Sequence, residues 1–141
     1  MAFAGGPMRI HTLDHLVLCV ADVAATCAFY ERALGLEPRQ ERPGKWSLHF
    51  GAHKISLQDA AAAPSIARDT VPGSGNFCLI TDTPIATVIE HLGREGVAIT
   101  DGPGERAGAT GPILSVYFRD PDGNLVEVSN RLPPAQATSP P

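Results

Sequence analysis

The sequence has no long apolar run, no basic stripe and no signal-like start, and each absence argues against a class of protein. No apolar stretch approaches the roughly 20 residues that cross a bilayer, so we expect no membrane association. The formal net charge is -4 without a stripe of Lys or Arg, which argues against nucleic-acid binding. The first residues, MAFAGGPMRI, lack a charged segment followed by an apolar one, so we expect no signal peptide.

The cysteines are few and odd in number. Cys19, Cys27 and Cys78 each fall within an apolar pattern, which predicts buried, reduced thiols in a cytoplasmic protein rather than a disulfide framework. A chain of 141 residues is long enough for one domain or for two tightly paired half-modules.

The first half of the chain reads as strand, helix and hairpin. Residues 13–20 (LDHLVLCV) are almost continuously apolar, as in a well-buried strand whose one face carries His15. Asp22 is a good N-cap for a helix over about 23–34, and Gly35 is a plausible residue to end it. Alternating apolar residues then predict strands over 46–50 and 53–58.

The second half repeats this order after a segment rich in Ala, Pro, Ser and Gly. Thr83 is the expected N-cap of a helix that starts at Pro84. The Pro121-Asp122-Gly123 turn joins two strands. The expected segments are a linker over 59–75, strands over 76–81, 97–100, 113–118 and 125–128, an irregular glycine-rich stretch over 101–112, and tails over 1–9 and 131–141, the second disordered by composition.

Glu127 is an acid between Val126 and Val128 in the last predicted strand. Strand alternation places Glu127 on the same face as Leu125 and Ser129. An inward-facing carboxylate needs a partner or a metal, whereas an outward-facing one could pair with a lysine or arginine on a solvated face. The sequence leaves both alternatives open.

The repeated order predicts an α+β fold with two tandem βαβββ modules, whose curled mixed sheet surrounds a shared cleft. His15 lies seven residues before its helix cap, and Asn76 lies seven before Thr83. Ser56 and Glu127 are likewise equivalent in the last strand of each module. We therefore hypothesise that these four positions converge. The domain is expected over 10–130, with module one at 10–58 and module two at 76–130.

The stretches LDHLVLCV, FYERALGL and GPILSVYFRDPDGNLVEVSN resemble the vicinal oxygen chelate superfamily over roughly residues 12–130. This superfamily includes glyoxalases, bleomycin resistance proteins and extradiol dioxygenases. Within it, the chain is similar to small glyoxalase-domain proteins related to biphenyl-2,3-diol dioxygenase-like and virulence-associated members. The resemblance implies a homodimer and a divalent metal (Fe, Mn, Ni, Zn or Mg) that chelates two neighbouring substrate oxygens.

The resemblance also implies roles for particular residues. His15 matches the first metal ligand, and Glu127 matches the last ligand and a catalytic group. The two intervening ligand positions, glutamate in bacterial glyoxalase I and histidine in glyoxalases and dioxygenases, fall on Ser56 and Asn76. Gln58 shares the face of Ser56, so Gln58 and Asn76 are candidate additional metal ligands. Alternatively, His15 is a core histidine bonded to backbone.

Four residues are candidate substrate contacts. Ser56 and Gln58 would contribute from the first module. Arg106 would be carried by residues 102–111, which form either a mobile lid or an ordinary flexible loop. Tyr117 is either a cleft wall or, like Trp46, a core or interface residue.

The sequence therefore supports three functional hypotheses. The first is a divalent-metal-dependent enzyme, with lyase, isomerase or ring-cleaving dioxygenase chemistry on a small oxygenated metabolite. The second is a non-enzymatic binder of a drug or metabolite, of the bleomycin-resistance type. The third is a dimeric scaffold without a ligand. The histidine and glutamate missing at Asn76 and Ser56 argue against standard dioxygenase and glyoxalase I activity.

Overall fold

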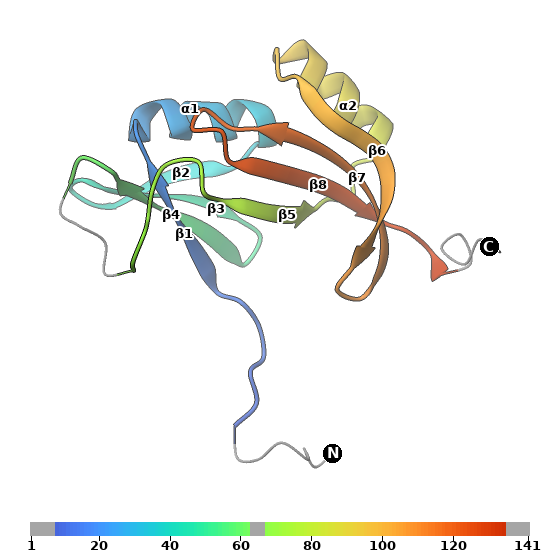
Figure 1. The fold of residues 1–141 in the computed structure, drawn as a ribbon, viewed down its shortest axis with the longest axis horizontal. Helices are drawn as coiled ribbons and strands as arrows, with labels where there is room; N and C mark the ends of the chain where they lie inside the picture. Colours follow the sequence, from blue (N-terminus) through green and yellow to red (C-terminus); the bar gives the residue numbers. More distant parts are fainter. Residues whose placement is uncertain (1–7, 63–66, 135–141) are drawn as a thin grey trace.

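The computed structural model describes residues 8–62 and 67–134, so the outermost parts of both expected tails and the middle of the expected linker lie outside the described residues. Two βαβββ modules follow one another, as the repeat predicts (Figure 1). The first module comprises β1 (His15–Val20), α1 (Val23–Leu34), β2 (Glu37–Arg42), β3 (Lys45–Phe50) and β4 (His53–Asp59). The second comprises β5 (Asn76–Ile80), α2 (Ile85–Arg94), β6 (Ile99–Gly108), β7 (Gly111–Arg119) and β8 (Leu125–Arg131).

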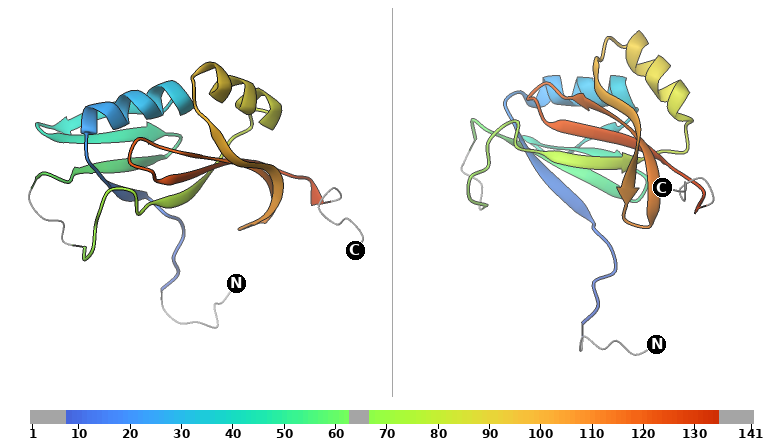
Figure 2. Two further views of the ribbon diagram at one scale, coloured as in Figure 1. Left: turned by 45° about the horizontal axis from the view of Figure 1, so that its top comes forward. Right: turned by 45° about the vertical axis from the view of Figure 1, so that its right-hand side comes forward.

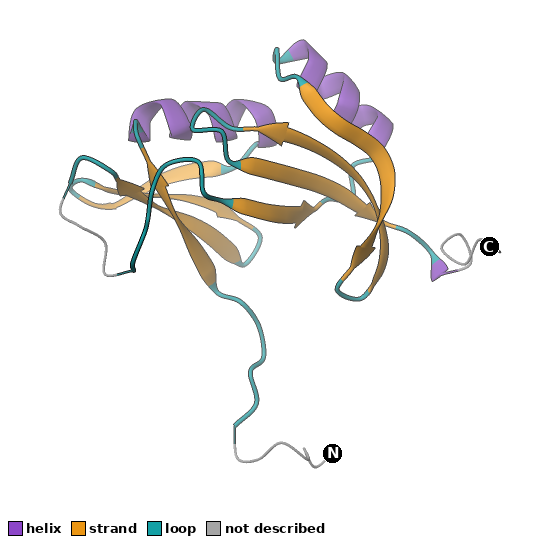
Figure 3. Ribbon diagram, viewed as in Figure 1, coloured by secondary structure: helices purple, strands orange, loops and turns teal. Residues whose placement is uncertain are grey.

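Each module forms its own four-stranded mixed sheet, in the orders β1-β4-β3-β2 and β5-β8-β7-β6. The first and last strands of each module pair in parallel, and the other pairs are antiparallel. Both helices lie over the same side of the sheets (Figures 2 and 3). We call the opposite side of each sheet its open face, and neither α1 nor α2 covers it. The α+β prediction with two modules is confirmed.

The strand register supports the internal alignment of the repeat. In the first sheet His15 pairs with Lys54, two residues before Ser56. In the second sheet Asn76 pairs with Leu125, two residues before Glu127. His15 and Asn76 are therefore structural equivalents, and so are Ser56 and Glu127.

The two helices begin in different ways. The Asp22 side chain caps α1 as predicted, because its Oδ1 accepts from the backbone N–H of Ala25 at 2.9 Å. The prediction of a Thr83 cap for α2 is wrong, since the N-cap residue is Pro84 and its side chain makes no capping bond. The Asn130 side chain of β8 replaces that cap, accepting from the Ile85 N–H at 2.7 Å. A cap supplied from 45 residues away leaves no local sequence signal.

Strand β2 was not predicted. Its sequence EPRQER has no apolar alternation, and most of its residues are exposed. It lies at the edge of the first sheet and pairs only with β3 among the described strands. An edge strand with little buried surface needs no apolar side chains, so strand patterning does not detect it.

The glycine-rich stretch over 101–112 was predicted to be irregular, and that prediction is wrong. Strand β6 continues through it to Gly108, which pairs with Gly111 of β7. Two register shifts between Ile99 and Gly104 absorb the unusual residues. Gly102 has a φ of +89°, and a Cβ there would collide with the Ser115 carbonyl of β7. The glycines thus permit bulges in a strand, and residues 102–108, including Arg106, belong to β6 rather than to a loop.

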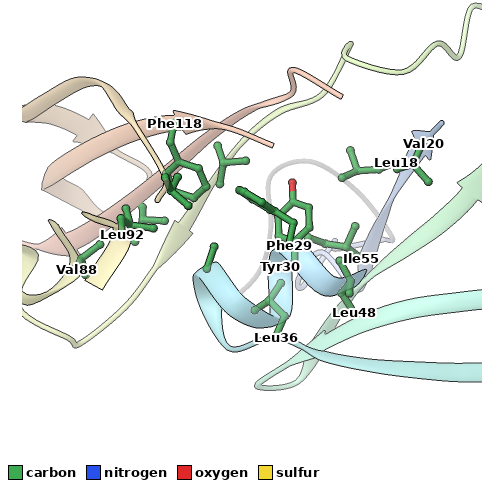
Figure 4. Packing of buried hydrophobic residues seen from close by; sticks show 14 of the residues in the cluster. Leu18, Val20, Phe29, Tyr30, Leu36, Leu48, Ile55, Val88, Leu92 and Phe118 are labelled. Atoms are coloured by element: carbon green, nitrogen blue, oxygen red, sulfur yellow. The ribbon is translucent and has the colours of Figure 1, made fainter. Parts of the chain in front are cut away.

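One hydrophobic core joins the modules (Figure 4). The ring centroids of Phe29 on α1 and Phe118 on β7 are 6.1 Å apart. The expectation of buried cysteines is wrong, because Cys19 and Cys27 are half-buried and Cys78 is exposed. No helix in the described part of the chain is long and apolar enough to cross a bilayer.

The turn before β8 fastens the second module to the first. The buried Tyr30 hydroxyl of α1 donates to Asp120 Oδ2 at 2.7 Å, and Asn124 Nδ2 donates to the same oxygen at 2.8 Å. Burial first, and then the Asp120 carboxylate, raise the pKa of Tyr30, so its phenol remains a donor. Asp122 Oδ1 also accepts from the Ala21 N–H at the start of α1, at 3.1 Å. We call these contacts the inter-module clamp.

Candidate functional site

The open face of the second sheet holds a pocket of about 490 Å³, which we call the Glu127 pocket. Its wall combines a carboxylate, a phenol, a thiol and two guanidinium groups with small apolar side chains. The lining residues are Cys78, Ile80, Arg106, Ala107, Gly108, Ala109, Ile113, Tyr117, Glu127 and Arg131. A pocket of this size with a few convergent polar groups is typical of small-molecule sites.

Neutral hydrogen-bond donors hold the Glu127 carboxylate in place. Ser115 Oγ donates to Glu127 Oε2 at 2.6 Å, and Ser115 Oγ lies 2.6 Å from Ser129 Oγ. Cys78 Sγ lies 3.3 Å from Ser129 Oγ. Because Ser115 donates its proton to Glu127, Ser129 donates to Ser115 and the Cys78 thiol donates to Ser129. This relay occupies one carboxylate oxygen and runs through two fully buried serines.

The Tyr117 phenol and the Cys78 thiol both have raised pKa values. Desolvation first, and then the Glu127 carboxylate, raise the pKa of Tyr117. Desolvation also raises the pKa of Cys78. Both groups therefore stay protonated at neutral pH. Cys78 is a hydrogen-bond donor in the relay rather than a reactive thiolate.

Arg106 reaches this pocket from β6. Its guanidinium carbon lies 5.5 Å from the centroid of the Tyr117 ring, within the range of a cation–π contact. Its Nη2 lies 3.4 Å from Asp101 Oδ2, and both side chains are partly exposed. The structure thus brings together three predicted site residues, Glu127, Arg106 and Tyr117.

The other predicted site residues lie elsewhere. His15 is on β1, half-exposed, with Nδ1 at 2.8 Å from Asp14 Oδ2, so the alternative of a core histidine is wrong. Ser56 is buried in β4, and Gln58 follows it half-buried on the same strand. Asn76 is exposed at the start of β5 and lines a different pocket of about 280 Å³. None of these four residues lines the Glu127 pocket.

The donor set of one chain does not fit a metal site. Within residues 8–62 and 67–134, no group of three or more His, Cys, Asp or Glu side chains lies close enough to hold an ion. His15 and Glu127 stand on different sheets, and their neutral equivalents Asn76 and Ser56 are weak ligands. The convergence of the four positions therefore stays a prediction that a single chain does not support.

Sequence reasoning missed four residues that build or line this site, namely Cys78, Ser115, Ser129 and Arg131. Strand alternation could have found them, since Ser129 and Arg131 follow Glu127 at steps of two. Cys78 is paired directly with Glu127 in the sheet, and Ser115 with Ser129.

A family model described as the Glyoxalase/Bleomycin resistance protein/Dioxygenase superfamily matches residues 12–128. The chain belongs to this superfamily. It is 47% identical over 124 residues to the virulence protein STM3117 of Salmonella typhimurium, covering 86% of this chain and 85% of that protein. An integron cassette protein of V. cholerae has 44% identity and a TM-score of 0.86, covering 90% of this chain and 100% of the other.

More distant superfamily structures carry functional names. A lactoylglutathione lyase of Agrobacterium tumefaciens has 26% identity and a TM-score of 0.67, covering 87% of this chain and 96% of that one. TnmS3, an antibiotic-binding protein of Streptomyces sp. CB03234, has 22% identity and a TM-score of 0.71, covering 89% and 100%. The second likeness shows the shared fold alone.

Proposed function

We propose that the protein binds a small oxygenated molecule in the Glu127 pocket. The observation that carries this proposal is the gathering of Glu127, Tyr117 and Arg106 in one pocket on the open face of the second sheet. The antibiotic-binding superfamily protein shows that this fold can serve as a binder. This function corresponds to the bleomycin-resistance alternative.

The relay prepares Glu127 as a hydrogen-bond acceptor for the ligand. Ser115 fixes one oxygen and Ser129 holds Ser115 in place, so the relay keeps the carboxylate in one orientation. The other oxygen would accept from a ligand hydroxyl. Such charge-assisted bonds are roughly twice as strong as neutral ones. The apolar walls would exclude water from one side of the ligand.

Binding is tested by titrating the protein with catechol and with the hemithioacetal of methylglyoxal and glutathione, each followed by ligand-observed NMR and calorimetry. We expect Glu127→Gln to weaken binding about tenfold, since it replaces a charge-assisted bond by a neutral one. Glu105→Gln is the matched control, because Glu105 is exposed on the same strand as Arg106 but does not line the pocket. Equal effects of the two variants would contradict the proposal.

A second candidate is a divalent-metal-dependent enzyme, and one observation favours it. The Asp14 carboxylate accepts from Nδ1 of His15, which fixes the tautomer whose Nε2 carries a lone pair. A carboxylate behind the ring is the usual support of a metal-binding histidine. Bound with His15 and Glu127 as ligands, the ion would supply Lewis-acid chemistry to a substrate oxygen. Because these ligands stand on separate sheets, a homodimer would have to bring them together.

This candidate is tested by elemental analysis of protein purified without chelators, together with its mass in solution. A dimer holding a stoichiometric metal that His15→Ala and Glu127→Ala both remove would support the enzyme. His53→Ala, which removes an exposed histidine at the start of β4, should keep the metal. Protein without metal in the parent would exclude this candidate and leave the binder.

A further inference from the structure

The lining of the Glu127 pocket carries two arginines and one carboxylate. Arg106 of β6 and Arg131 of β8 both pair in register with Ile113 of β7, so they flank the same residue from either side. All three line the pocket. Both side chains therefore leave the sheet beside Ile113 and reach the pocket.

Neither arginine is fully matched by a carboxylate. Among the described residues, the Arg131 side chain makes no hydrogen bond and no ion pair. Besides its contact with the Tyr117 ring, Arg106 has the 3.4 Å contact with Asp101 and a bond to the carbonyl of Glu105. A guanidinium carries five N–H donors, so both groups keep donors for a ligand. Such a fork suits an oxyanion, and a carboxylate above all.

A glycine leaves room for one of these groups. A Cβ added at Gly104 would lie 2.5 Å from Arg106 Nη1 and 3.3 Å from its Cζ. The guanidinium of Arg106 therefore rests against the backbone of Gly104 while it lies over Tyr117. Any larger side chain at Gly104 would displace Arg106 without removing its charge.

Glu127 and Arg131 lie far apart in the pocket, whereas the Arg106 guanidinium lies over Tyr117, the residue paired with Glu127. Glu127 and Arg131 are four residues apart on β8, which corresponds to roughly 13 Å along a strand. Ile80 and Ile113 supply apolar surface to the pocket, and Ile80 is 43% exposed. A ligand that reached both Glu127 and Arg131 would need an apolar body between its polar groups.

We propose that the pocket takes a small organic acid whose carboxylate meets Arg131, whose hydroxyl donates to Glu127, and whose apolar body covers Ile80 and Ile113. The Arg106 guanidinium over Tyr117 adds to the positive potential that favours the acid. This inference rests on the proposed binding function and names its ligand class. A neutral or cationic ligand would leave the two guanidinium groups unmatched.

Four one-ring probes of similar shape test this class by calorimetry at neutral pH. 4-Hydroxybenzoate has both groups, 4-hydroxybenzamide lacks the charge, benzoate lacks the hydroxyl, and 4-hydroxybenzylamine reverses the charge. We expect 4-hydroxybenzoate to bind at least tenfold more tightly than each of the others. Glu127→Gln should remove most of the difference between 4-hydroxybenzoate and benzoate.

Three variants test which residues recognise the carboxylate of the ligand. Arg131→Leu should reduce the preference for 4-hydroxybenzoate over 4-hydroxybenzamide about tenfold, as expected for the loss of a charge-assisted fork. Gly104→Ala should reduce the same preference while every charge is retained. Arg94→Leu, which removes an exposed arginine of α2 outside the pocket, is the control of equal charge change.

Distinct outcomes separate the two proposals. If 4-hydroxybenzamide or 4-hydroxybenzylamine binds as well as the acid in a Glu127-dependent manner, the ligand class is wrong and the binding function stands. The class is also wrong if Arg131→Leu and Arg94→Leu behave alike. If none of the four probes shows Glu127-dependent binding, both proposals fail.

Discussion

The open faces of the two sheets are equivalent in the repeat, but their carboxylates are paired with different kinds of groups. On the first sheet, Arg39 Nη1 lies 3.4 Å from His49 Nδ1, and His49 Nε2 lies 2.9 Å from Ser47 Oγ. Ser47 donates to Glu41 Oε1 at 2.5 Å, and Lys54 donates to the same oxygen at 2.8 Å. This chain of contacts neutralises the Glu41 carboxylate with a cation of its own sheet.

On the second sheet, the Glu127 carboxylate is held by neutral groups. Ser115 and Ser129 orient Glu127 without neutralising it, and Arg131 has no side-chain partner among the described residues. The unmatched charges of both signs stand in the Glu127 pocket. The comparison indicates that polar groups on the first sheet pair with one another and stabilise the fold. Those on the second sheet remain available to bind a ligand.

The largest effect is expected when a carboxylate is introduced into the first sheet at the position equivalent to Glu127. Ser56 is the equivalent of Glu127, but it is only 3% exposed and pairs with Ser47 beside the Glu41 carboxylate. We expect Ser56→Glu to lower the free energy of unfolding by about 3 kcal/mol, the cost of a buried charge without its own partner. Chemical denaturation would measure this loss, with Ser56→Ala as the control for removing the hydroxyl. A Glu variant as stable as the Ala variant would show that the two faces are interchangeable.

The next test asks whether the two sheets are one folding unit. The Tyr30 hydroxyl donates to Asp120 across the inter-module clamp at 2.7 Å, and both residues are buried. We expect Tyr30→Phe to lower the free energy of unfolding by about 2 kcal/mol, because a buried carboxylate loses a donor. Unfolding should remain a single transition, since the hydrophobic core also joins the modules.

Tyr117→Phe provides the matched control for this variant. Tyr117 is half-buried in the Glu127 pocket, where water can form the hydrogen bonds that its hydroxyl would otherwise make. Its removal should therefore cost less stability than that of the Tyr30 hydroxyl, while it weakens ligand binding. Equal losses of stability in both variants would contradict the role of the clamp.

The architecture could be predicted from the sequence because both modules show the same order of strand and helix patterns. Strand alternation and the Asp22 cap predict the first module, and the same spacing recurs before the second helix. The alignment of Ser56 with Glu127 then follows, and the strand register agrees with it. Local patterns fail where the stabilising contact is distant, as with Asn130 at the start of α2, or where a strand buries little, as in β2.

The site was only partly predictable for a related reason. Glu127 stood out because a carboxylate between two valines is unusual, and Arg106 and Tyr117, which were also named as candidates, line the same pocket. Ser115, Ser129 and Cys78 are ordinary in strands, and their function depends on neighbours across the sheet. The predicted convergence of His15 with Glu127 came from symmetry and the resemblance, and it stays a prediction.

The smallest expected effect concerns how the first sheet holds Glu41. Hydrogen bonds from Lys54 and then from Ser47 lower the pKa of Glu41 to about 2. A carboxyl with a lowered folded-state pKa contributes stability above its unfolded pKa of about 4.5, and that contribution is lost as the pH falls toward 2. The stability advantage of the wild type over Glu41→Gln should therefore shrink between about pH 4.5 and pH 2, as measured by denaturation at each pH. Glu90→Gln, an exposed α2 variant, controls for removing one surface carboxylate. An advantage that does not change with pH would mean that the charge of Glu41 contributes nothing, and the two open faces would then differ only in shape.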